Sequence, residues 1–432
     1  MENLTHTLIG LMAGEAVAQT TPAALKGLPP GVRRGLFVTL AAVGGNLPDL
    51  DLVYSFKFGP RDKLAYLLEH RGYTHTVLGC LVLALLLYLG AECWIRWRGL
   101  QPTSKDRAEL AGVAVFGTLL HLAMDALNSY GVHPFWPLQN RWFYGDSVFI
   151  VEPLYWVAVA PLIFVVRSTT ARWMLALCLV AAVAAGAIAN PGRPQWPLTF
   201  AIASLVLIFI GKKATARTAA LTSAGLMLCV TATFVLAGRA AAARVETIAR
   251  ERFPADRLID HVLTPSPTNP LCWDVLLLET RADRYTVRHG VFAKAPSIIS
   301  AQRCPDVSAA QRTTAPMVAV AAPDSSEIHW LGEFGMSREQ LVALVATHCD
   351  AARLMQFARV PFATELKGRP VIGDLRFDRE PQLGMSELAL ENRSIGACVL
   401  TVPWLPPRAD LLGVSATPAA RVPQSRSSRP GS

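Results

Sequence analysis

Apolar residues gather in eight stretches over the first 238 residues of the chain, and polar residues separate these stretches. A helix needs about 17–25 mainly apolar residues to cross a bilayer. The stretches predict membrane-spanning helices at 3–19, 33–49, 74–93, 109–129, 150–166, 173–190, 197–211 and 218–238. The first two contain more polar residues than the others. We therefore expect them either to cross as short or tilted helices or to be re-entrant and covered by the other helices.

From about residue 239 the long apolar stretches end. The pattern there predicts paired strands, an amphipathic helix and a further strand at 273–280, 285–292, 337–357 and 371–378. A final segment is rich in Pro, Ser and Arg, a composition typical of disorder. The fold class is therefore mainly α: a polytopic transmembrane helical bundle of about eight spans over 1–238, a small extramembrane α+β domain over 239–404, and a disordered tail over 405–432.

Composition supports this division. The chain is 52% apolar and only 17% charged, its mean hydropathy is +0.33, and soluble domains are about 25% charged. The composition therefore excludes a soluble protein with one large core and favours a membrane protein. The net charge is +9, but no patch combines basic and aromatic residues as nucleic-acid-binding surfaces do. We expect the lipid bilayer as a partner and no nucleic acid.

Lysine and arginine in the short loops indicate the orientation, because cytoplasmic loops carry the excess of positive charge. One set of alternate loops holds twelve such residues: Lys26, Arg33, Arg34, Arg96, Arg98, Lys105, Arg107, Arg167, Arg172, Lys212, Lys213 and Arg217. The other set holds six: Lys57, Arg61, Lys63, Arg71, Arg141 and Arg193. We expect the first set to be cytoplasmic and the C-terminal domain to be extracytoplasmic. Cysteines in that domain can then form one or two disulfides, whose pairing the sequence leaves open: they are Cys272, Cys304, Cys349 and Cys398.

Histidines and aspartates occur where the first four predicted helices reach the outer side. Two imidazoles and two carboxylates flank the loop between the second and third helices, and a His/Asp pair four residues apart shares one face of the fourth. The seven residues are His6, Asp49, Asp51, His70, His75, His121 and Asp125. The orientation of the helices was inferred from Lys and Arg alone. The placement of all seven His and Asp residues on one side was therefore not an assumption of that inference.

This set predicts a metal site. Seven such side chains exceed what one structural zinc ion needs. They suit either a catalytic ion with an open coordination position or two ions bridged by a carboxylate. Imidazole and carboxylate ligands favour a divalent ion, Zn²⁺ first and Mn²⁺ or Fe²⁺ as alternatives. One or two ions would lower the pKa of a bound water to about 7, which predicts a hydrolase acting on a phosphoester, ester or amide.

Two carboxylates are candidates for catalysis as well. Asp51 is a candidate for both ligand and catalytic roles. Glu152 begins the fifth predicted helix on the same side, where it is either a general base or a first-turn acid that the helix dipole favours. His133 is a further candidate ligand, and Asp146 is expected in a turn. Each metal candidate also has a simpler explanation, such as a helix cap for Asp49 or a solvated loop for His70.

At these residues the chain resembles the YdjM-like family of membrane-bound, metal-dependent hydrolases, which are associated with the inner membrane and are under LexA control. The matching pieces, over about residues 1–165, are His6 with its Thr-Leu-Ile-Gly continuation, Leu47-Pro48-Asp49-Leu50-Asp51, His70-Arg71-Gly72, Thr74-His75-Thr76, and His121 with Asp125. The resemblance implies a multi-pass protein of the bacterial inner membrane and a metal-dependent hydrolase. It does not define the substrate; the membrane location alone favours a lipid-linked or envelope substrate.

Two alternatives remain from other functional classes. A transporter for metal ions or protons would also place ionisable groups inside helices, and it predicts polar residues through the full depth of the bundle. A non-catalytic scaffold would use the metal only as a structural staple, with the outward domain as its working part.

Overall fold

The computed structural model describes residues 1–22, 27–55, 63–189, 195–305, 313–378, 382–391 and 398–413. Most of the predicted tail, from residue 414 onward, lies outside these ranges. Four loop charges used for the orientation also lie outside them: Lys26, Lys57, Arg61 and Arg193.

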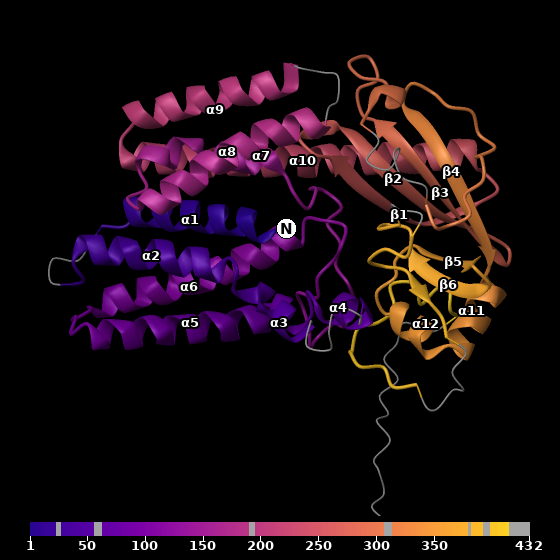
Figure 1. Ribbon diagram of the computed structural model, residues 1–432, viewed down its shortest axis with the longest axis horizontal. Coiled ribbons are helices and arrows are strands. Elements are labelled where there is room, and N and C mark those ends of the chain that lie inside the picture. The colour runs from indigo at the N-terminus through magenta and orange to yellow at the C-terminus, as the bar shows by residue number, and fades with distance from the viewer. Residues whose placement is uncertain are drawn as a thin grey trace, which may run out of the picture.

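Long helices run side by side through the first part of the chain, and the C-terminal domain lies at one end of them (Figure 1). They are α1 (Asn3–Thr20), α2 (Pro30–Gly44), α5 (Val77–Trp97), α6 (Ser104–Asp125), α8 (Thr169–Ala189), α9 (Gln195–Lys213) and α10 (Ala216–Arg252). Short segments lie between them: η1 (Leu47–Leu50), α3 (Asp51–Ser55), α4 (Lys63–Glu69), η2 (Tyr73–His75), α7 (Pro153–Ala158) and η3 (Ala160–Phe164).

Five of the described helices are long and apolar enough to cross a membrane, namely α5, α6, α8, α9 and α10. A sixth candidate is the pair formed by α2 and the segment Leu47–Ser55, which is bent by 51°. The expected number of about eight spans is therefore not confirmed in the part of the chain that is described. The second predicted span contains the bend, because residues 45–46 interrupt the helix before Asp49.

The fifth predicted span, 150–166, is not one continuous helix. It divides into α7, of six residues, and η3, of five. Pro161 is the second residue of η3, and a proline has no N–H with which to continue the hydrogen bonds of the preceding turn. Both this segment and α1 are packed inside the bundle: α1 contacts α2, α6, α7 and α10, and its residues from Thr5 to Glu15 are buried except Thr7. Enclosure by other helices explains why α1 tolerates polar residues.

Glycines allow α1 to approach α2 closely. A Cβ added to Gly10 would lie 2.5 Å from the carbonyl oxygen of Ala41, and one added to Gly14 would lie 2.6 Å from the Cα of Val38. Both positions therefore require the absence of a side chain. The close approach places the first turn of α1 beside the end of α2, where the predicted metal ligands begin.

The C-terminal domain contains two antiparallel sheets. The larger has the order β1-β2-β3-β4, with β1 (Arg257–Ser266), β2 (Asn269–Arg281), β3 (Arg284–Ala293) and β4 (Ile328–Ser337). The smaller has the order β5-β6-β7, with β5 (Pro361–Leu366), β6 (Arg369–Asp374) and β7 (Leu388–Ala389). The predicted strands 273–280 and 285–292 are confirmed within β2 and β3, which pair in register. Of the strand predicted at 371–378, only 371–374 lie in β6, and a turn follows at 375–377.

Two other details of this domain differ from expectation. Helix α10 continues to Arg252 and packs on β1 and β2, so the change of structure comes later than residue 239. The predicted helix 337–357 is two helices, α11 (Arg338–Thr347) and α12 (Cys349–Leu354). His348 separates them with extended backbone angles, and the side chain of Ser337 caps α11.

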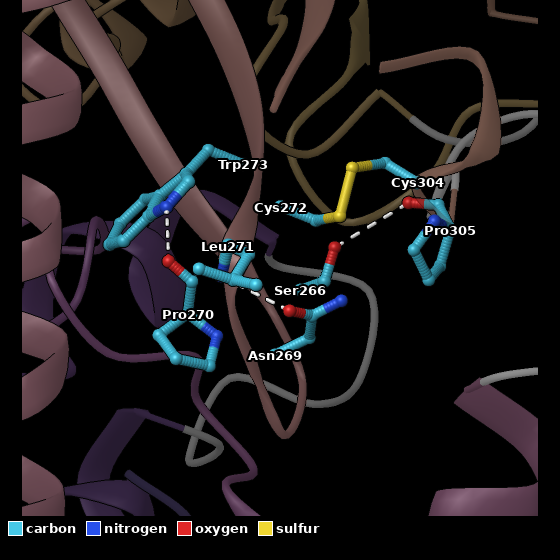
Figure 2. Close-up of a disulfide and its surroundings, with 8 residues drawn as sticks. All are labelled: Ser266, Asn269, Pro270, Leu271, Cys272, Trp273, Cys304 and Pro305. Atoms are coloured by element: carbon cyan, nitrogen blue, oxygen red, sulfur yellow. Dashed lines mark hydrogen bonds between the residues drawn. A yellow bond between two sulfur atoms is a disulfide. The ribbon is translucent and has the colours of Figure 1, made fainter. Parts of the chain in front are cut away.

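Two disulfides stabilise the domain, and both pair predicted cysteines. Cys272 in β2 bonds to Cys304, which follows η4 (Ala301–Arg303), and Figure 2 shows this bridge beside the β1–β2 turn. Cys349 at the start of α12 bonds to Cys398. The cysteines of the membrane helices form no disulfide.

The domain is docked on the loops at one end of the bundle. Leu64, Leu67 and Leu68 of α4 share a hydrophobic core with domain residues such as Phe357. The indole N–H of Trp404 donates to the carbonyl oxygen of Leu68 at 2.8 Å. The bundle end that carries the predicted site is thus covered by the C-terminal domain.

Candidate metal centre

The seven predicted ligands meet in one buried cluster. They come from α1, from the segments after α2, from the loop before α5 and from the last turns of α6. None is more than 8% exposed. The helices therefore deliver these side chains to one level of the molecule, as the loop charges and helix directions had predicted.

Four of these side chains form the tightest group. Asp49, His75, His121 and Asp125 each offer one ligand atom, and these atoms all lie within 4.8 Å of one another. The Nε2 atom of His75 is 3.3 Å from Asp49 Oδ1 and 3.3 Å from Asp125 Oδ2. The corresponding distances from Nε2 of His121 are both 3.6 Å. Two carboxylates and two imidazoles are a donor set that zinc, manganese and iron accept.

The hydrogen bonds on the far side of each imidazole fix its tautomer. Nδ1 of His121 lies 2.7 Å from the carbonyl oxygen of Gly45, which can only accept, so this nitrogen carries the hydrogen. Nδ1 of His75 lies 3.1 Å from the Thr74 hydroxyl, which donates its own hydrogen to Asp51 and so accepts one from this nitrogen. Asp51 Oδ2 is itself 3.1 Å from Nδ1. In both neutral rings Nε2 then has a free lone pair.

These two lone pairs face each other. The Nε2 atoms of His75 and His121 are 2.9 Å apart, a distance at which two unprotonated nitrogens repel. Oδ2 of Asp125, beside them, is buried without a hydrogen-bond partner among the described residues. A cation between the four donors removes the repulsion and satisfies this oxygen. The residues present therefore fit a divalent metal ion.

Asp51 has a different position from the other carboxylates. One of its oxygens lies 2.9 Å from Nδ1 of His70. The other accepts the backbone N–H of Arg71 at 2.8 Å and the Thr74 hydroxyl at 3.0 Å, and faces His75. Asp51, His70 and Asp49 do form a second group within 4.8 Å, but the existing bonds of Asp51 place it better as the residue that orients the histidines.

His6 lies against the other side of Asp125. Its Nε2 atom is 3.2 Å from Asp125 Oδ1, and its ring stacks on that of His121 with 3.9 Å between centroids. The same carboxylate oxygen contacts the amino group of Met1. His6 therefore supports the orientation of two residues of the tightest group and belongs to neither group of candidate ligands.

Arg71 is a site residue that the pattern of His and Asp did not reveal. Its Nε atom lies 3.0 Å from Asp125 Oδ2, although the two are not aligned as a hydrogen bond. Its Nη1 donates to Asn128 Oδ1 at 2.9 Å, and the guanidinium lies over the Tyr130 ring. Arg71 adopts a φ of 60°. The available signal in the sequence was its place in His70-Arg71-Gly72.

The other candidates lie outside the two donor groups. Glu152 caps α7: its carboxylate accepts the backbone N–H of Leu154 at 3.0 Å and that of Thr268 at 3.0 Å. Both oxygens are thus occupied, which favours the helix-terminus explanation over a general base. Asp146 pairs with Arg359 at 2.8 Å. His133 is buried in stacking contact with Trp404 and faces the carbonyl oxygen of Arg71 at 3.3 Å.

Apolar helices of membrane-crossing length around a buried His/Asp donor set define a multi-pass membrane protein with a candidate metal site. Residues 1–193 match the family model described as YdjM inner membrane protein, so this part of the chain is similar to that family. The matched range contains both donor groups and ends before the C-terminal domain. The description gives a location and no reaction. No curated protein and no solved structure matches the chain.

Proposed function

We propose that the protein is a metal-dependent hydrolase with one divalent ion, most simply Zn²⁺, held by Asp49, His75, His121 and Asp125. The observation that carries this proposal is the meeting of four buried donors, two of them imidazole nitrogens without protons. When bound, such an ion supplies an activated water and withdraws electrons from an ester, amide or phosphoryl group. Mn²⁺ and Fe²⁺ fit the same donors.

The surrounding residues then have distinct tasks. Asp51 and the carbonyl of Gly45 hold the two ligand histidines in the tautomer that leaves Nε2 free. Arg71 adds a positive charge beside Asp125. With a divalent ion it balances the three aspartates, so that an anionic substrate meets a site without excess negative charge. The second group shares Asp49 with the first, which leaves room for a second ion bridged by this carboxylate.

We further propose that the site and the C-terminal domain face the extracytoplasmic side of the bacterial inner membrane. The family and the apolar helices support the membrane location. The excess of Lys and Arg in the opposite loops supports the orientation. The two disulfides agree with it, because disulfides persist in oxidising compartments.

Buried carboxylates at a distance from the site are paired with arginines. Glu15 pairs with Arg34 at 2.9 Å, and Asp106 lies 3.5 Å from Arg33. Such pairs neutralise the charges and fix neighbouring helices together. They favour a local metal site over a transport path through the bundle, which would need exchangeable polar groups at successive depths.

The metal content of detergent-purified protein tests the proposal. Elemental mass spectrometry of the wild type should find one equivalent of zinc, manganese or iron, or two if the Asp49-bridged site fills. The doubly substituted His121→Ala/Asp125→Ala protein should lose the ion and keep its helical circular dichroism spectrum. Hydrolysis of phosphoester, ester and amide substrates would then be compared between the two proteins.

Absence of metal from both proteins under chelator-free conditions would contradict the metal site. Metal without turnover of any substrate class would favour the scaffold. In that case the main effect of Asp125→Ala should be a lower melting temperature, because the metal would serve only to stabilise the fold.

A further inference from the structure

A cavity of about 390 Å³ lies beside the metal centre, between the bundle and the C-terminal domain. Tyr66, His70 and Arg71 line it from the bundle side, and Thr264, Phe377 and Met385 line it from the domain. Arg71 belongs to both the cavity and the metal centre, since its Nε atom is 3.0 Å from Asp125 Oδ2. A molecule in this cavity is therefore adjacent to the four donors.

Three polar groups on the lining residues have no hydrogen-bond partner among the residues that the structure describes. They are Nε of Arg71, Nδ2 of Asn128 and the hydroxyl of Tyr130. The orientation of the Asn128 amide is fixed, because its oxygen accepts both from Arg71 Nη1 and from the Tyr130 backbone N–H, each at 2.9 Å. Its nitrogen is therefore a donor. All three side chains are at least 95% buried.

Buried donors without a hydrogen-bond partner indicate that a ligand with acceptor oxygens completes the site, because an unsatisfied buried donor destabilises the folded protein. A guanidinium among them favours a negatively charged ligand. The rest of the lining is mainly apolar, including Val148, Phe149 and Ile150. A ligand whose anionic group lies near the metal centre can therefore place a hydrocarbon chain against the apolar lining of the cavity.

The loop beside the cavity also exposes large apolar side chains. Phe135 is 55% exposed, Leu138 91% and Ile150 41%. They lie on the segment between α6 and α7, at the end of the membrane helices. Exposed Phe and Leu side chains can insert at the boundary between head groups and acyl chains. Ile150 also lines the cavity, which places the cavity within reach of lipid head groups.

We propose that this cavity binds the phosphate group of a membrane lipid or lipid-linked phosphoester. Arg71, Asn128 and Tyr130 donate to its oxygens, and the apolar wall holds the first part of its chain. The C-terminal domain thereby forms one wall of the substrate site. Turnover of this ligand rests on the hydrolase function proposed above, whereas its binding does not. In the hydrolysis, a water oxygen bonds to phosphorus, the P–O bond to the lipid alcohol breaks, and a water proton ends on the leaving oxygen.

Binding of phosphatidic acid with a fluorescent acyl chain tests the proposal, measured by anisotropy in detergent micelles on the full-length protein. The wild type should bind it at least about tenfold more tightly than diacylglycerol with the same label, as expected for hydrogen bonds to a charged group. Tyr130→Phe and Asn128→Asp should each weaken binding about fivefold or more. Inorganic phosphate should compete only at far higher concentration, since it lacks the chain.

Tyr144→Phe is the matched control, because this hydroxyl is also buried without a partner but lines a different cavity, beside Arg359. It should bind like the wild type. Equal affinity for diacylglycerol, unchanged affinity of Tyr130→Phe, or equally effective competition by inorganic phosphate would each overturn the proposal. If Asn128→Asp fails to fold, Tyr130→Phe still decides.

The two proposals fail differently. Protein that binds phosphatidic acid as expected but releases no phosphate contradicts the hydrolase and leaves the cavity assignment intact. Protein that contains the metal and hydrolyses soluble esters without any preference for the phosphate lipid contradicts the cavity assignment alone.

Discussion

Individual side chains in the metal centre differ in role although they are of the same type. Asp49 and Asp125 face the two free imidazole nitrogens, whereas Asp51 is occupied by His70, Arg71 and Thr74. This difference arises because different neighbouring groups contact each carboxylate. It predicts that the three aspartates respond differently to the same substitution.

Asp51→Asn should weaken metal binding by about 10–100-fold, the usual effect of removing a group that orients a ligand histidine. His75→Ala should abolish binding at the same site, because it removes a ligand. Competition with a fluorescent zinc chelator measures both affinities, and Asp283→Asn on the exposed β2–β3 turn is the control. An equal loss of metal affinity in Asp51→Asn and His75→Ala would indicate that Asp51 is itself a metal ligand.

A second residue-scale prediction concerns Glu387 in the C-terminal domain. Burial raises the pKa of its carboxyl to about 7 from an ordinary 4.5, and one of its oxygens has no hydrogen-bond partner among the described groups. The folded state therefore holds the proton more tightly than the unfolded state does. Stability from this group is greatest below about pH 4.5 and is lost as the pH rises to 7.

Melting temperatures of wild type and Glu387→Gln between pH 5 and 8 test this sign. The amide keeps the shape of the protonated acid, so the wild type should lose stability relative to the variant as pH increases. A difference between the two that is constant over this range would show that Glu387 does not titrate there.

At the scale of helices, the close contact between α1 and α2 decides where His6 lies. Gly10→Ala should force the helices apart, since the added Cβ would be 2.5 Å from Ala41 O. We expect a loss of about 1–3 kcal/mol in stability, as for other overpacked contacts, together with weaker metal binding. Gly112→Ala in α6 is the matched control, because nothing lies within 4 Å of its added Cβ and alanine favours helix.

Thermal unfolding and metal titration of the two alanine variants measure this difference. Gly112→Ala should be neutral or slightly stabilising. A Gly10→Ala protein as stable as Gly112→Ala, with unchanged metal affinity, would mean that α1 does not depend on this contact.

At the scale of the whole molecule, α3 and α4 lie at the end of the bundle that adjoins the C-terminal domain (Figure 1), and α3 begins at Asp51 of the candidate metal centre. The metal centre and the domain must then be on the same side of the membrane. We expect alkaline phosphatase fused after residue 413 to be active in a bacterial host, since this enzyme needs an oxidising compartment for its disulfides. A fusion in the loop after Lys213, at the opposite end, should be inactive.

A fluorescent protein that matures only in the cytoplasm should give the reverse pattern at the same two positions. Activity of the phosphatase after Lys213 and not after residue 413 would reverse the proposed orientation. It would also remove the support that the disulfides give to an extracytoplasmic domain.

The sequence by itself determined the class of membrane protein, the approximate positions of most long helices and the level at which His and Asp residues meet. These features depend on the local periodicity of apolar residues, on the length of apolar segments and on the charge of the loops. All three can be determined from short stretches of sequence without knowledge of the rest of the chain. Strands β2 and β3 could be predicted for the same reason, since their residues have strong strand preference around a short turn.

Only the tertiary structure decided which residues act together. The distance between His75 and His121, the orienting role of Asp51, the position of Arg71 and the cavity shared with the C-terminal domain all depend on how separate helices pack. The break in 150–166 and the two disulfide pairings depend on packing as well. A shift of one helix by a few ångströms would leave every sequence pattern unchanged and would disperse the metal centre, because ligand geometry is set by contacts between residues far apart in the chain.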